Sequence, residues 1–208
     1  MRSTFITLAC LIMATNVFAG EGVLKGKVAD GKTQEELIGV TVRIKELPSN
    51  GDCLIEADNR EDNFANRPQS RPTLSNLTLI GNNDTNAQKR GIRLRAGTAV
   101  KLYNVLVTGK PNTVTVATAE TEASFQDGTS VIEHLWASKA FVYESISDLA
   151  LETKTGNAIN QTISFTNGYV GTIAGGKDLF ADDNFFTSTN YKGAVPTDND
   201  WTAGWTRK

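Results

Sequence analysis

Residues 74–109 have the sequence LSNLTLIGNNDTNAQKRGIRLRAGTAVKLYNVLVTG, in which one short pattern occurs twice. Asn76 opens the first copy, NLTLIG, and Asn104 opens the second copy, NVLVTG, 28 residues later. A third alternating run, GIRLRAG at 91–97, lies between the two copies. Each period therefore carries two short strands followed by glycine, which is typical of one coil of a β-solenoid.

Stacking of such coils explains why the pattern repeats. A single coil cannot bury its inward aliphatic side chains, whereas stacked coils bury a continuous column of them and pair their backbones in parallel. Asn76 and Asn104 occupy matching positions, so we expect their amides to hydrogen-bond to each other and to the turn backbone. Gly81 and Gly109 follow the two strands and supply the bends.

The pattern continues in a weaker form towards the C-terminus. Further strands are predicted at 114–116, 131–136 and 162–168, and short helices are predicted at 119–126 and 142–153. The predicted fold is mainly β: a short parallel β-helix of about three to four coils with an N-terminal β-hairpin and one or two inserted helices.

The first 19 residues, MRSTFITLACLIMATNVFA, are predicted to be a signal peptide. Arg2 precedes an apolar run that is shorter than the roughly 20 residues needed to span a bilayer. We therefore expect an exported protein, located in the periplasm, at the outer-membrane surface or outside the cell, with no membrane span in the mature chain. Removal of Cys10 with the signal leaves Cys53 as a lone thiol, which is predicted to be a small buried residue.

Residues 20–46 are predicted to form a β-hairpin, because two alternating runs flank a polar turn. The residues GVLKGKVAD at 22–30 and LIGVTVRIK at 37–45 resemble the start of the carboxypeptidase-regulatory-like domain that precedes the plug of TonB-dependent outer-membrane receptors. The resemblance ends at residue 46, so it implies a truncated domain and an envelope protein as a partner.

A second resemblance begins in the segment that follows. Residues 55–59, IEADN, and 72–81, PTLSNLTLIG, are similar to secreted right-handed β-helix proteins of unknown function from Gram-negative bacteria, over most of 52–208. This resemblance implies a right-handed coil with an irregular ending. The predicted organisation is a boundary segment at 47–73, β-helix coils at 74–180 and an aromatic C-terminal cap at 181–208.

The aromatic ending permits two interpretations. Tyr191, Trp201 and Trp205 lie there with two phenylalanines. Large aromatic side chains are more often buried than displayed, which favours a cap over the end of the coil stack. The alternative is a platform on which sugar rings stack, so these three residues are candidate ligand-binding residues.

Four charged residues form the other candidate site. Glu56 and Asp58 are two apart on one predicted strand, as are Arg93 and Arg95 on the next, so each pair shares a face. Polysaccharide lyases with β-helix folds hold Ca²⁺ on clustered carboxylates and abstract a proton with Arg or Lys, and hydrolases use facing carboxylates. A solvated outer face is the simpler interpretation, so Ca²⁺ enters only under the lyase alternative.

The remaining composition argues against several classes of function. Lys and Arg total 21 against 23 for Asp and Glu, so no basic surface for nucleic acid is expected. The one histidine, His134, has no recognisable catalytic partner, and we assign no catalytic residue and no metal ligand. The favoured function is a non-enzymatic binding or structural module, associated with glycan or an envelope protein. The alternatives are a polysaccharide lyase or hydrolase, and a shortened gene product without independent activity.

Overall fold

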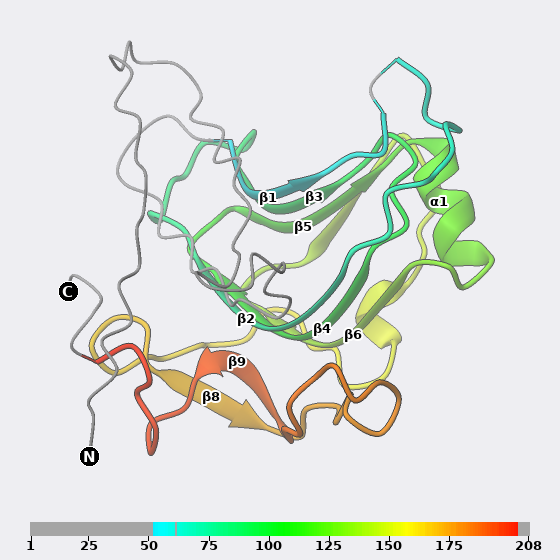
Figure 1. Ribbon diagram of the computed structural model, residues 1–208. Coiled ribbons are helices and arrows are strands. Elements are labelled where there is room, and N and C mark those ends of the chain that lie inside the picture. Colours follow the sequence, from blue (N-terminus) through cyan, green and yellow to red (C-terminus); the bar gives the residue numbers. More distant parts are fainter. Residues whose placement is uncertain (1–51, 61, 204–208) are drawn as a thin grey trace, which may run out of the picture. The chain divides into compact units, whose positions relative to one another are not determined.

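A computed structural model describes residues 52–60 and 62–203, all of which belong to one compact unit at 41–208. The predicted signal peptide and the predicted hairpin at 20–46 lie outside the described residues. Seven strands alternate along the chain between two parallel sheets. Figure 1 shows the two sheets facing each other. One sheet has the order β1 (Cys53–Ala57), β3 (Arg90–Leu94), β5 (Asn112–Ala117), β7 (Phe141–Glu144), and the other β2 (Thr73–Ile80), β4 (Lys101–Thr108), β6 (Val131–Ala137).

The alternation of strands between the two sheets is the arrangement of a parallel β-helix. The register places Leu77 opposite Val105 and Val105 opposite Leu135, so like residues stack on one another. The 28-residue repeat of the sequence therefore corresponds to the step from β2 to β4. β1 lies within the predicted boundary segment 47–73 and pairs in parallel with β3, so its strand is part of the same sheet.

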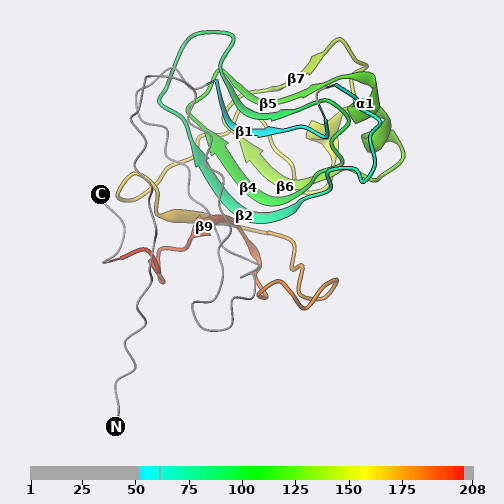
Figure 2. The same ribbon diagram turned by 45° about the horizontal axis from the view of Figure 1, so that its top comes forward.

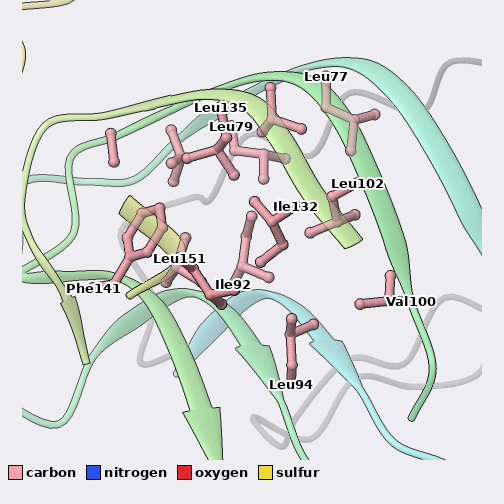
Figure 3. Packing of buried hydrophobic residues seen from close by; sticks show 14 of the residues in the cluster. Leu77, Leu79, Ile92, Leu94, Val100, Leu102, Ile132, Leu135, Phe141 and Leu151 are labelled. Atoms are coloured by element: carbon pink, nitrogen blue, oxygen red, sulfur yellow. The ribbon is translucent and has the colours of Figure 1, made fainter. Parts of the chain in front are cut away.

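The core lies between the two sheets (Figure 3). Ile92, Leu94 and Val114 point inward from one sheet, and Leu102 and Leu135 point inward from the other; all five are fully buried. Burying an aliphatic side chain of this size stabilises a fold by roughly 1.5–3 kcal/mol, so this stacked column dominates the stability of the fold.

The helix predicted at 119–126 is confirmed as α1 (Ala119–Gln126). Its buried face is polar. Thr121 Oγ1 accepts a hydrogen bond from the Gly97 N–H at 3.0 Å, and Ser124 Oγ donates to the Thr98 carbonyl at 3.1 Å. The insertion is therefore attached to the turn between β3 and β4 by hydrogen bonds.

The prediction of a helix at 142–153 is wrong. This segment contains the end of β7 and a single 3₁₀ turn, η1 (Leu151–Thr153). Parallel pairing of β7 with β5 replaces the local helical bonds, while Ile146 and Leu149 still pack against the core. Tertiary pairing here overrides a helical spacing of apolar residues.

The prediction of a strand at 162–168 is also wrong. In this segment only Thr166 makes a β-bridge, an isolated one to Val170. The chain instead forms an antiparallel hairpin from β8 (Gly171–Ala174) and β9 (Tyr191–Val195). Within the described residues, no helix has the length and apolar character needed to cross a membrane.

The β8–β9 hairpin lies on the outer side of the β2-β4-β6 sheet, away from the other parallel sheet (Figure 2). Asn76 Nδ2 donates to the Tyr191 carbonyl at 2.9 Å, and the Ala194 N–H donates to Thr78 Oγ1 at 2.9 Å. The described part of the aromatic ending therefore covers the side of the coils and is attached by hydrogen bonds to β2.

Candidate functional site

The four charged residues singled out in the sequence come together on the outer face of the β1-β3-β5-β7 sheet. Parallel pairing places Glu56 directly opposite Arg93. Arg93 Nη1 lies 3.3 Å from Glu56 Oε1, Arg95 Nε lies 2.9 Å from the same oxygen, and Arg95 Nη2 lies 3.1 Å from Asp58 Oδ2. Because Ile92 and Leu94 point into the core, the alternation of the strand turns the two arginines outward.

Three further residues, which the sequence did not single out, extend this group. The Arg90 side chain is 9% exposed, and its guanidinium lies 3.2 Å from the Asp52 carboxylate and 2.7 Å from that of Glu144. Arg93 also approaches Glu144, at 3.6 Å. We call the following set the charged cluster: Asp52, Glu56, Asp58, Arg90, Arg93, Arg95 and Glu144. No local pattern links Arg90 to Glu144, 54 residues away.

Each arginine of the charged cluster is paired with carboxylates of β1 and its flanking residues or, across β5, with Glu144 of β7. Burial alone lowers the pKa of the Arg90 guanidinium, but the hydrogen bond and the charge of Glu144 outweigh burial and raise that pKa above its ordinary value. Arg90 is therefore a permanent cation that holds two carboxylates and not a free base.

The carboxylates of the charged cluster do not form a cation site. Calcium takes six to eight oxygen ligands, whereas Arg95 binds both Glu56 and Asp58. Among residues 52–60 and 62–203, no three His, Cys, Asp or Glu side chains come together in a group that holds a metal ion. The residues present therefore do not fit the Ca²⁺ of the lyase alternative.

Cys53 borders the charged cluster and is half-buried. Burial, reinforced by the negative charges of Asp52 and Glu56, raises the pKa of its thiol to about 12. A thiol with so high a pKa is protonated at neutral pH and is a poor nucleophile. The sequence predicted a buried residue, whereas Cys53 is half-buried, with a thiol whose raised pKa makes it unreactive.

His134 takes part in a ladder of polar side chains on the β2-β4-β6 sheet. Asn76, Asn104 and His134 occupy the same position in the three strands and all have positive φ, from 54° to 57°. The predicted bond between the two asparagines is present, with Asn104 Nδ2 at 3.3 Å from Asn76 Oδ1. His134 Nδ1 donates to the Gly175 carbonyl at 2.8 Å, which makes it a structural residue.

The backbone partners of this ladder differ from those expected. The sequence predicted hydrogen bonds to the turns of the coil itself. Asn76 instead donates to carbonyls of β9, and Asn104 donates to the Lys177 carbonyl at 2.8 Å and accepts from the Lys177 N–H at 2.7 Å. The ladder therefore attaches the C-terminal hairpin and its loop to the coils.

The aromatic candidates occupy packing positions. Trp201 packs against a second small core that contains Tyr169, Val170 and Val195, and its indole Nε1 donates to the Ala194 carbonyl at 2.9 Å. Tyr191 is the first residue of β9 and is half-buried. Trp205 lies outside the described residues. Tyr191 belongs to β9 and Trp201 packs against β9, which contacts the β2-β4-β6 sheet, whereas the charged cluster lies on the other parallel sheet, so the two candidate groups do not form one site.

Two parallel sheets, alternating strands and a polar ladder at the bend of one sheet define the chain as a parallel β-helix protein. Residues 40–206 match the model of a family described as the pectate-lyase-like β-helix domain, and the chain belongs to this family. Neither the search of curated proteins nor that of solved structures finds a match.

Proposed function

We propose that the chain is an exported, non-enzymatic β-helix module of the cell envelope that binds glycan. The observation that carries the non-enzymatic part is the pairing within the charged cluster. Glu56, the carboxylate that an enzyme at this face would use, accepts from both Arg93 and Arg95. Catalysis by general acid or base requires a group that is free to exchange a proton with substrate.

The charged cluster has a structural role in this proposal. Its ion pairs connect β1 with the neighbouring β3, and β3 with β7 across the intervening β5, and thereby join strands from different coils. Partly exposed pairs each stabilise by roughly 0–1 kcal/mol, so their main effect is to hold the register of the sheet face rather than to add much stability.

Several finer features belong to the same proposal. Export rests on the apolar segment at 1–19, and a Gram-negative envelope rests on the two resemblances of the sequence. The right-handed winding comes from the resemblance, and the three to four coils come from the repeat. The extended sides of a solenoid suit a polymeric ligand, which favours glycan over a small molecule.

The test uses the purified chain and a panel of neutral and acidic polysaccharides. We expect retarded migration in at least one polysaccharide-containing gel, with neither new reducing ends nor unsaturated products in solution. Glu56→Gln is the test variant, and Asp198→Asn is the matched control, because Asp198 is an exposed acid outside the charged cluster. Product formation that Glu56→Gln abolishes and Asp198→Asn preserves would establish the enzyme alternative.

The third interpretation, a shortened gene product without independent activity, predicts another outcome. Absence of both retention and products across the panel would refute the proposed function and support that interpretation. Co-purification with a TonB-dependent barrel would instead support a receptor-associated protein, as the N-terminal resemblance implies.

A further inference from the structure

Two large apolar side chains in the described part of the chain are exposed, Phe180 at 51% and Phe185 at 41%. Both belong to the loop between β8 and β9. Phe185 packs edge to face against Phe186, with ring centroids 5.2 Å apart and an interplanar angle of 87°. Exposed aromatic side chains beside a concave surface are typical of binding sites.

Phe185 and Phe186 line a hollow of about 340 Å³ between this loop and the starts of β2 and β4. Tyr103 and Lys101 contribute to it from β4, and Asp182 and Asp183 contribute from the loop. Phe180 does not line the hollow. The hollow thus combines aromatic rings with carboxylates and an ammonium group.

The position of the hollow is set by the polar ladder. Lys177 is held through its backbone by Asn104. Its ammonium lies 5.2 Å from the centre of the Tyr103 ring and 3.1 Å from Asp182 Oδ2. Leu179, two residues further on, is buried. The loop is therefore anchored at its base, and the site on it is pre-organised.

Tyr103 adds a polar group to the hollow. Its hydroxyl forms no hydrogen bond with the residues that the structure describes, although only 8% of the residue is exposed. Burial raises the pKa of this hydroxyl, with a smaller opposite effect from Lys177, so it remains protonated and is able to donate. A hydroxyl without a protein partner at the edge of a hollow is available to a ligand or to water.

We propose that this hollow binds one uncharged pyranose ring of a glycan, stacked on Phe185 and hydrogen-bonded by Tyr103, Lys101 and the carboxylates of the loop. Each sugar hydroxyl both donates and accepts, which suits carboxylates placed beside an ammonium and a phenol. Lys101 and Lys177 offset Asp182 and Asp183 in charge, so the site has no excess of positive charge for an acidic sugar.

This inference rests on the proposed glycan-binding function and names its site. The probes are methyl glycosides of glucose, galactose and mannose, with galacturonate as the acidic comparison. Binding is measured by saturation-transfer NMR and titration on the full chain. Phe185→Ala is the test variant, and Phe180→Ala is the matched control, because both side chains are exposed and only Phe185 lines the hollow.

We expect at least one neutral glycoside to bind with millimolar affinity. Phe185→Ala should weaken it about three- to tenfold, the range for one aromatic contact. Tyr103→Phe should weaken it several-fold at unchanged thermal stability, and Phe180→Ala should leave it unchanged. The inference is overturned if Phe185→Ala has no effect, if Phe180→Ala weakens binding as much, or if only galacturonate binds. Glycan retention that is as strong in Phe185→Ala as in the wild type would reject this site while leaving the proposed function intact, whereas no retention of any glycan by the wild type rejects both.

Discussion

Replacing Asn104 by alanine is expected to lower the free energy of unfolding by about 3 kcal/mol. Asn104 is fully buried, and its amide binds both the N–H and the carbonyl of Lys177, at 2.7 Å and 2.8 Å. Alanine leaves both backbone groups without these partners, at about 1 kcal/mol each. The φ of 57° at position 104 adds a further cost of about 1 kcal/mol, because alanine tolerates the left-handed region less well than asparagine.

The two contributions can be separated by two further variants. Asn104→Gly loses the same hydrogen bonds without the left-handed strain, so it should be about 1 kcal/mol less destabilising than the alanine variant. Asn83→Ala is the matched control: Asn83 has φ 60° and lies exposed, and its side chain makes no hydrogen bond to the described residues. Asn83→Ala should lower the free energy of unfolding only by the conformational cost of about 1 kcal/mol.

The assay is urea unfolding of the full chain followed by circular dichroism, with a check that the slope on denaturant stays constant. The ladder's contacts also predict that Asn104→Ala weakens glycoside binding in the hollow, because Lys177 anchors the loop that carries Phe185. The reasoning would be refuted if Asn104→Ala lowered the free energy of unfolding by no more than Asn83→Ala does. Such a result would mean that the buried amide contributes nothing beyond its backbone conformation.

Two other predictions concern ionisable groups. Native Cys53, whose thiol pKa is about 12, should react with iodoacetamide at pH 8.5 about a thousandfold more slowly than in the urea-unfolded chain; comparable rates would contradict its burial. Lys192 has a lowered pKa because of desolvation, although its ammonium donates to the Ala174 and Gly175 carbonyls and lies 5.4 Å from the Trp136 ring centre. Between the lowered pKa of Lys192 in the folded chain and its ordinary value near 10.5, the unfolded chain binds more protons at Lys192 than the folded chain does. The contribution of Lys192 therefore makes the free energy of unfolding rise with pH in that window. Urea midpoints of wild type and Lys192→Met, compared across that window, isolate this contribution; parallel curves would show that Lys192 is not desolvated.

Much of the scaffold was predictable from local pattern. The spacing of Asn76 and Asn104, the alternation around Arg93 and the insertion at 119–126 each correspond to an observed strand pairing or helix. These features depend on a residue's neighbours within a few positions, because strand side chains alternate and because matching coils stack in register. The same alternation placed Glu56 beside Arg93 once β1 paired with β3.

Errors arose where distant segments competed with local preference. The spacing of apolar residues at 142–153 indicated a helix, yet pairing with β5 made its beginning a strand. The sequence also drew attention to Trp201, which packs in a small core, and missed Phe185, which is exposed. Composition indicates how many aromatic residues a segment has, but not which of them the fold leaves in contact with solvent.

The sequence by itself determined the coil repeat, the inward column of aliphatic residues and the outward charges of β1 and β3. Only the tertiary structure decided what those outward groups bind. Arg90 meets Glu144 54 positions away, and Asn104 meets Lys177 73 positions away. The physical reason is that burial follows from short-range periodicity, whereas hydrogen-bond partners follow from which segments the fold brings together. The ion pairs within the charged cluster and the position of the hollow between a loop and a sheet both follow from contacts between distant segments.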